Sequence, residues 1–157
     1  MKIDFVCKQN FIKNSTFKSI IWGNYKMKSL ETAQAELKKL GLDNFATLAS
    51  YRGSLEIVLK NMKENEKIKA VTMGISKRTN YLICATDTQI LCGCKPLIGK
   101  LKEMTFSLDD ISSISLKSTL IFGHNIIINL KDGTEMKFNS DNKKATAGFV
   151  EIAATLV

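Results

Sequence analysis

The chain has 157 residues, with 23 Lys or Arg, 15 Asp or Glu and a single His, so its formal net charge is +8. A hydrophobic content of 45% excludes a wholly disordered chain. No apolar run reaches the roughly 20 residues that cross a bilayer, and residues 1–10 hold no continuous apolar stretch of signal-peptide length. We therefore expect a cytoplasmic protein of about one domain.

The single His excludes most hydrolytic and His-dependent chemistry. His124 precedes the apolar run Ile126–Ile128, which is typical of a polar residue at the start of a strand. No nucleophile or orienting motif accompanies it. The nine glycines form no phosphate-binding loop. We therefore expect neither an enzyme nor a bound cofactor.

The cysteines indicate buried thiols rather than a metal site. Cys92 and Cys94 form a C-x-C pair, whereas zinc sites generally use two C-x-x-C pairs. On a strand, both would lie on one face together with Ile90. Free Cys is among the most buried residue types, and thiols stay reduced in the cytoplasm.

The N-terminal part of the chain is predicted to be mainly helical. Residues 1–28 combine six Lys and one Asp, a local charge of +5, with large apolar side chains. Residues 29–40 predict a helix that Ser29 caps. Its apolar residues fall on one face: Leu30, Ala33, Leu37 and Leu40. Residues 44–62 predict two helices divided at Gly53-Ser54, with Ser54 as the cap of the second.

From Lys67 the apolar period changes to two, which predicts strands. The predicted strands are residues 67–77, 81–85, 89–94, 101–106, 111–116, 124–130 and 135–138. Residues 95–100 hold the only proline and indicate a loop, and Asp132-Gly133 indicates a hairpin. Residues 140–142 are helix-capping types. A closing helix would then bury one face: Ala145, Phe149, Ile152 and Leu156.

This order of elements predicts an α+β fold. Seven short antiparallel strands would form a bent β-barrel, and the amphipathic C-terminal helix would cap its open end. A mainly helical extension would precede the barrel. The predicted division is residues 1–49 for the extension and residues 50–157 for the barrel domain.

Several motifs in the second part are similar to one known family. In chain order they are Leu-Glu-Ile-Val-Leu at 55–59, Glu-Lys-Ile at 66–68, the hairpin at 81–91, the segment Phe-Ser-Leu-Asp-Asp-Ile-Ser-Ser-Ile at 106–114, and Lys-Asp-Gly at 131–133 before the closing helix. Together they resemble the pleckstrin-homology (PH) superfold, and most closely the bacterial PH domains called YokE-like. Gln89 stands where an Arg is common in this family. The resemblance covers about residues 50–157.

The leading functional hypothesis is a non-enzymatic PH-like binding module that acts on a protein partner. The partner would be a host protein or a second copy of the chain. The residue types favoured at interface centres lie in the basic N-terminal segment: Phe17, Lys18, Trp22, Tyr25 and Lys26. Relatives of this family occur in bacterial and prophage genomes. In a phage-encoded chain, the hypothesis extends to an inhibitor of a host enzyme or defence complex.

An alternative is peripheral binding to anionic membrane lipids. In eukaryotic relatives, basic residues around the first hairpin bind phosphoinositide headgroups, and Lys69, Lys77 and Arg78 fall in the corresponding stretch. The second strand has no basic residue at 81–84, so we expect weak attraction to acidic membranes rather than a specific headgroup site.

A second alternative is non-specific nucleic-acid binding, which a charge of +8 would allow. The charge is divided evenly, +4 over residues 1–66 and +4 over residues 67–157, and no nucleic-acid-binding motif is present.

Overall fold

The computed structural model describes residues 30–39, 45–63, 65–96, 98–119 and 123–157. The elements, in chain order, are α1 (Leu30–Lys39), α2 (Phe45–Asn61), β1 (Ile68–Ser76), β2 (Thr79–Thr86), β3 (Gln89–Cys94), β4 (Lys102–Ser107), the short 3-10 helix η1 (Leu108–Asp110), β5 (Ile111–Ser118), β6 (His124–Leu130), β7 (Glu135–Ser140) and α3 (Lys143–Ala154). The seven predicted strands and the C-terminal helix are confirmed.

The strands form an open sheet and not the predicted closed barrel. Their order is β4-β3-β2-β1-β7-β6-β5, and every paired neighbour is antiparallel. β4 and β5 are consecutive in sequence, but η1 separates them, and each pairs only on its other side, with β3 and β6. A barrel needs a ladder between its first and last strands. The sheet therefore keeps two edges.

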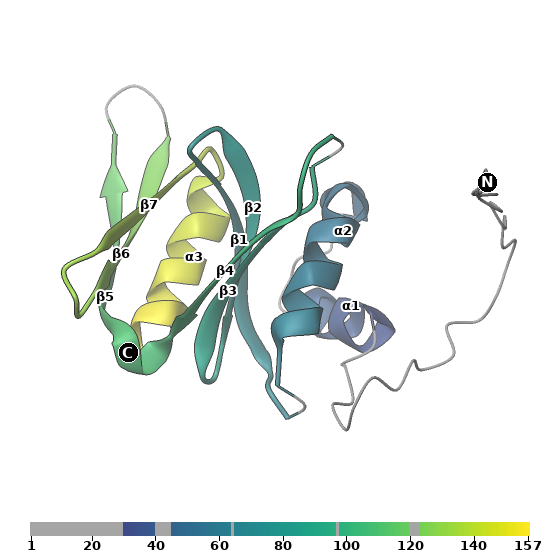
Figure 1. The fold of residues 1–157 in the computed structure, drawn as a ribbon, viewed down its shortest axis with the longest axis horizontal. Coiled ribbons are helices and arrows are strands. Elements are labelled where there is room, and N and C mark those ends of the chain that lie inside the picture. The colour runs from purple at the N-terminus through teal and green to yellow at the C-terminus, as the bar shows by residue number, and fades with distance from the viewer. Residues whose placement is uncertain (1–29, 40–44, 64, 97, 120–122) are drawn as a thin grey trace, which may run out of the picture.

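The sheet consists of two halves joined at a narrow junction. The first half-sheet holds β1 to β4, and the second holds β5 to β7. β1 and β7 share a single register pair, Ile75 with Asn139. The β6–β7 ladder is continuous, and the β1–β2 ladder is interrupted only by a register shift between Ile68 and Ala70. α3 lies between the halves and packs against β1, β5 and β6 (Figure 1). The core on this side of the sheet includes Ile83, Ile128 and Phe138, all fully buried. The helix thus holds the halves together where the ladder is short.

The buried face of α3 is rotated from the predicted one. The Asn142 side chain caps the helix, as predicted. The buried side chains are Thr146, Phe149 and Ala153. Ile152, predicted to be buried, is 40% exposed. Thr146 faces inward because its hydroxyl donates to Ser140 Oγ at 2.8 Å, a pairing that apolar periodicity does not reveal.

α2 is one helix, so the predicted break at Gly53-Ser54 is wrong. The Ser54 hydroxyl does not cap a helix start; it accepts a hydrogen bond from the backbone N–H of Lys95 at 3.2 Å. A Cβ atom on Gly93 of β3 would lie only 2.5 Å from the Ser54 carbonyl oxygen. The missing side chain at Gly93 therefore lets α2 approach β3 closely.

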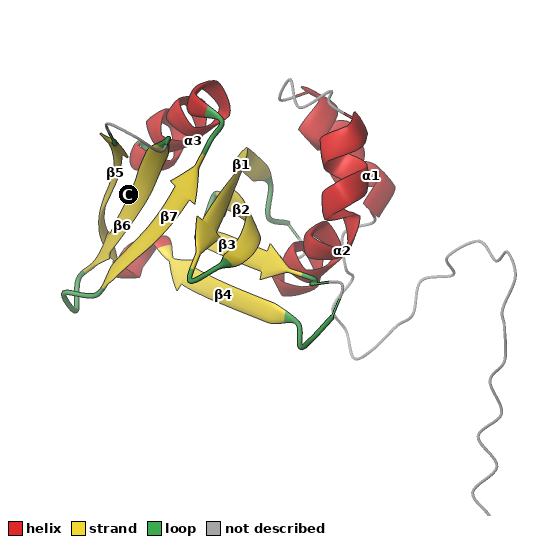
Figure 2. Ribbon diagram, turned by 90° about the horizontal axis from the view of Figure 1, so that it is seen from above, coloured by secondary structure: helices red, strands yellow, loops and turns green. Residues whose placement is uncertain are grey.

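A second core lies between the two N-terminal helices and the outer face of the first half-sheet. It includes Ala33 and Leu37 of α1, both fully buried, together with Val58 of α2 and Leu82 of β2. The first half-sheet is thus covered on both faces, by α3 on one side and by α1 and α2 on the other (Figure 2).

Candidate binding surfaces

One candidate surface is formed by two chain turns that lie at the same end of the first half-sheet. Because neighbouring strands are antiparallel, the β1–β2 turn and the β3–β4 loop share an end, at the top of Figure 1. Lys102 links them, since its Nζ donates to Thr79 Oγ1 at 2.7 Å. We call this surface the turn face and define it by Lys77, Arg78, Ile98, Lys100, Leu101 and Lys102.

The β1–β2 turn holds two cations in a backbone conformation that disfavours them. Lys77 and Arg78 have φ of 48° and 61°, in the left-handed region. A two-residue hairpin turn of type I′ needs positive φ at both central positions, and Asn-Gly adopts it most readily. Lys and Arg are strained there, by about 1 kcal/mol or more each. Stability alone therefore does not account for these two residue types.

The β3–β4 loop combines exposed aliphatic side chains with basic neighbours. Ile98 is 93% exposed and Leu101 is 61% exposed. No Asp or Glu occurs from residue 95 to residue 102. Lys95 pairs with Glu56 at 3.8 Å, but in the described part of the chain no ion pair involves Lys77, Arg78 or Lys100. Free cations around aliphatic side chains suit a surface that is anionic outside and apolar beneath.

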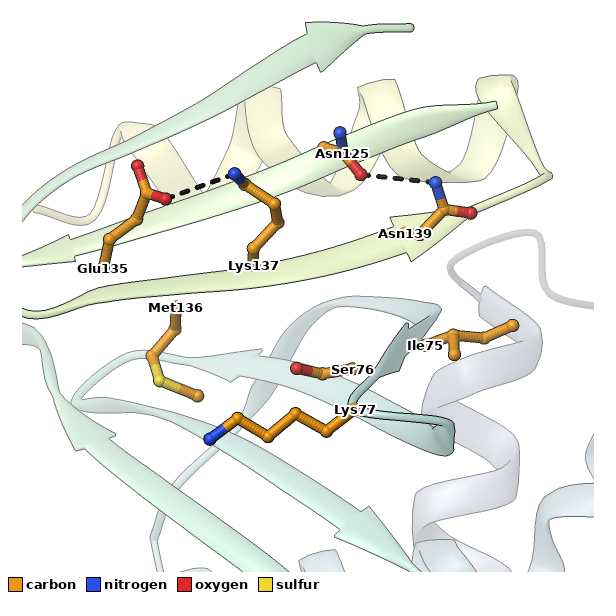
Figure 3. A pocket seen from close by; sticks show the side chains of 8 residues that line it. All are labelled: Ile75, Ser76, Lys77, Asn125, Glu135, Met136, Lys137 and Asn139. Atoms are coloured by element: carbon orange, nitrogen blue, oxygen red, sulfur yellow. Dashed lines mark hydrogen bonds and ion pairs between the residues drawn. The ribbon is translucent and has the colours of Figure 1, made fainter. Parts of the chain in front are cut away.

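The second candidate surface is a groove of about 400 Å³ between β7 and the β1–β2 hairpin. Its lining residues are Ile75, Ser76, Lys77, Asn125, Glu135, Met136, Lys137 and Asn139. Figure 3 shows Met136 pointing from β7 toward the hairpin, where the Lys77 side chain extends. On the other face of β7, Lys137 pairs with Glu135 at 3.3 Å, and the Asn139 amide donates to Asn125 at 3.3 Å.

The structure brings together only two of the predicted lipid-binding residues. Lys77 and Arg78 form the turn, whereas Lys69 lies near the start of β1, eight residues from Lys77, or about 26 Å along an extended strand. The predicted partner-binding residues in the stretch 17–26 lie outside the described residues. Sequence reasoning missed Ile98 and Leu101, although their alternation with Lys around the proline is visible in the sequence.

A buried polar network at the opposite end of the first half-sheet is structural. Glu66 is 4% exposed and accepts hydrogen bonds from the hydroxyls of Thr86 (2.6 Å) and Thr88 and from the Gln89 amide (2.8 Å). The backbone N–H of Lys63 donates to it at 2.7 Å. Burial alone would raise the pKa of Glu66, but these hydrogen bonds outweigh it and lower the pKa below the ordinary value. The network ties the end of α2 to the β2–β3 turn.

In the described part of the chain, the cysteines and the histidine are packed as part of the fold. Cys84, Cys92 and Cys94 are buried, and burial raises the pKa of Cys84 to about 12. Such thiols stay protonated at neutral pH and are poor nucleophiles. His124 is the first residue of β6, with Nδ1 3.2 Å from Ser118 Oγ. Across the described ranges, no three His, Cys, Asp or Glu side chains gather as a metal site would require.

Comparison with known families finds a match that covers the sheet and its C-terminal helix. The model of a family described as "Bacterial PH domain" matches residues 62–154, more than half of the chain. The match begins just after α2 and ends with α3, so it contains all seven strands. A search of curated proteins finds no match. No helix in the described part of the chain is both long and apolar enough to span a bilayer.

Proposed function

Because the chain belongs to the bacterial PH domain family, we propose that it is a binding module that docks on an anionic membrane surface through the turn face. PH-like domains generally act as non-catalytic binding modules. One observation carries the membrane proposal: Ile98 and Leu101 are exposed at the end of the sheet that also presents Lys77 and Arg78, which have no ion pair among the described residues. This develops the lipid alternative drawn from the sequence.

The magnitudes suit reversible, peripheral binding. Each basic side chain near an anionic bilayer contributes about 1 kcal/mol, so Lys77, Arg78 and Lys100 together contribute about 3 kcal/mol. Burial of an aliphatic side chain such as Ile98 adds about 1.5–3 kcal/mol. The sum, about 5 kcal/mol, corresponds to a dissociation constant of roughly 0.1–1 mM. A nucleic-acid backbone would satisfy the cations but would give the aliphatic side chains no apolar surroundings.

Sedimentation with lipid vesicles tests the proposal on the full chain. The chain should bind vesicles of mixed phosphatidylglycerol and phosphatidylcholine and should not bind pure phosphatidylcholine. The double variant Lys77→Asn, Arg78→Gly keeps a favourable turn sequence while removing two charges, so we expect binding about 30-fold weaker. Ile98→Ser with Leu101→Ser should also weaken binding by at least tenfold while leaving its salt dependence in place.

Lys69→Asn serves as the matched control, because it removes one charge at the far end of β1. Its vesicle binding should stay within a factor of two of the unmodified chain. Equal loss in Lys69→Asn and in the turn variant would refute a localised turn face and leave only a response to net charge. Equal binding to neutral and anionic vesicles would also contradict the proposal.

The protein-partner hypothesis remains a separate proposal. It rests on Phe17, Lys18, Trp22, Tyr25 and Lys26 and on the basic, aromatic composition of that segment. Placement in the YokE-like group and a role as a phage-encoded inhibitor are proposals of the same kind. A pull-down from the native host with the chain lacking residues 1–28 as the comparison would test them.

A further inference from the structure

The turn between β1 and β2 fixes which way the backbone groups point at the junction of the two half-sheets. Lys77-Arg78 is a two-residue turn that closes on the pair Ser76 and Thr79. In such a hairpin, the closing residues exchange hydrogen bonds with each other, so the backbone groups of Ser76 point toward β2. The direction of the backbone N–H and C=O groups alternates along a strand. These groups of Ile75 therefore point toward β7.

The same alternation leaves part of the β7 edge open. Asn139 is paired with Ile75, so the backbone N–H and C=O groups of Asn139, Lys137 and Glu135 all point away from β6 and toward the groove. β1 pairs with β7 only at Asn139. Within the described residues, no strand is paired with the edge at Lys137 and Glu135. An open strand edge is a template for another extended chain.

The side chains around this edge define what an added strand would meet. Met136 points inward and packs against the core, which gives the groove an adaptable apolar floor. Lys77 extends across the mouth and has no ion pair among the described residues (Figure 3). Lys137 is already paired with Glu135. The unmatched charge of the groove is therefore positive, and its volume of about 400 Å³ is within the range of ligand sites.

We propose that this groove binds an extended, acidic peptide segment of a partner protein, added as a strand to β7. The backbone of the segment pairs with Glu135 and Lys137, an apolar side chain rests on Met136, and an acidic side chain lies against Lys77. Strand addition supplies affinity through main-chain hydrogen bonds, and the flanking side chains supply selectivity. The inference rests on the open edge of β7, and Lys77 is the one residue that the groove shares with the turn face.

The test uses the full chain and a short, fluorescein-labelled peptide in which valine and glutamate alternate. Fluorescence anisotropy should show saturable binding, and the matching valine–lysine peptide should bind at least tenfold more weakly. Lys77→Glu should weaken binding of the acidic peptide by at least tenfold. In NMR spectra of the isotope-labelled protein, the amide chemical shifts of Glu135, Lys137 and Lys77 should change when the peptide is added.

A matched pair of variants separates the strand edge from its charge. Lys137→Pro removes the N–H that points into the groove, while the ladder to β6 uses the backbone groups of Met136 and Phe138. Lys137→Thr loses the same charge but keeps the N–H. We expect at least tenfold weaker binding for the Pro variant and less than a threefold change for the Thr variant.

Three outcomes would overturn the proposal. The first is the absence of saturable peptide binding. The second is equal peptide binding by the Pro and Thr variants when thermal unfolding shows both to be folded. The third is a set of amide shift changes confined to the other sheet edges, β4 and β5. Lys137→Pro leaves the turn face unchanged, so its vesicle binding should persist. Loss of peptide binding with retained vesicle binding would therefore separate the groove from the membrane surface.

Discussion

At the residue scale, two positions determine how α2 meets the sheet. Gly93 gives the helix room by having no side chain, and Glu66 collects hydrogen bonds from the β2–β3 turn and from the backbone after α2. Both positions belong to motifs visible in the sequence, the C-x-C pair and the Glu-Lys-Ile segment. Ser54, which faces Gly93, and Thr86, which donates to Glu66, lie 20 or more residues away from them in sequence, so these contacts were not predictable from local pattern.

Gly93→Ala should destabilise the protein. The added Cβ would lie 2.5 Å from the Ser54 carbonyl oxygen and 3.1 Å from a Val58 methyl group, so α2 would have to shift. Overpacking of this kind costs about 1–3 kcal/mol of unfolding free energy. Gly148→Ala in α3 is the control, because apart from its chain neighbours and the backbone of its own helix no atom lies within 4 Å of its added Cβ. It should stabilise by about 0.5–1 kcal/mol, since glycine is unfavourable inside a helix. Urea unfolding of both variants checks that their changes in unfolding free energy have opposite signs.

Glu66→Gln should make stability less dependent on acid pH. The folded-state pKa of Glu66 is lowered from its ordinary value of 4.5, so its charged form stabilises the fold fully above that value. This stabilisation is lost as pH falls through the lowered pKa. The Gln variant should unfold more easily by about 1–3 kcal/mol at pH 7, because carboxylate hydrogen bonds are lost. The deficit should shrink toward zero on acidification.

Urea unfolding at a series of pH values measures this effect. Glu151→Gln, at an exposed position of α3, is the control and should change little at any pH. A pH-independent deficit in the Glu66 variant would contradict the assignment of an ionised carboxylate to the network.

At the element scale, the strands were predictable because their apolar residues alternate and their turns carry distinctive residues. The errors occurred where a local signal competed with a distant partner. Gly53-Ser54 resembles a helix break, yet α2 continues because Ser54 accepts its hydrogen bond from the Lys95 backbone. In α3, the inward position of Thr146 depends on Ser140 rather than on apolar spacing. Barrel closure was mispredicted because it depends on whether β4 pairs with β5, which no local pattern reveals.

The β1–β2 turn yields a prediction in which stability and binding move in opposite directions. The double variant Lys77→Asn, Arg78→Gly replaces strained left-handed residues by types that favour this turn. We expect an increase of about 1 kcal/mol in unfolding free energy, measured by urea denaturation, together with the loss of vesicle binding described above. Arg78→Ala is the comparison, because it removes one charge without relieving the backbone strain. A destabilised double variant would show that the native turn residues make stabilising contacts.

At the scale of the whole molecule, the helices outside the family match are part of the fold. α1 and α2 cover the outer face of the first half-sheet, and Leu37 of α1 is fully buried there. The sequence predicted a helix at 29–40 with this apolar face. It could not show where that face packs, because the contacts join α1 to β1 over some thirty residues of chain.

Leu37→Ala tests whether the predicted division at residue 50 separates independent parts. If α1 belongs to the folded unit, the substitution should cost about 2–4 kcal/mol of unfolding free energy in a single cooperative transition. Gln34→Ala, at an exposed position of the same helix, should change stability by less than about 0.5 kcal/mol. An unchanged melting transition in the Leu37 variant would instead support a separate N-terminal extension.

The single register pair between β1 and β7 has a consequence for motion. Ile75 and Asn139 form the only register pair that joins β1 to β7 in the described residues, so the two half-sheets can rotate about this point. α3 contacts both half-sheets and limits that rotation. Slow opening of the molecule should therefore begin here, with the backbone amides of Ile75 and Asn139 exchanging with solvent sooner than those inside the β1–β2 ladder. A ligand strand in the groove would add backbone pairs at β7 and so reduce the motion of the whole protein.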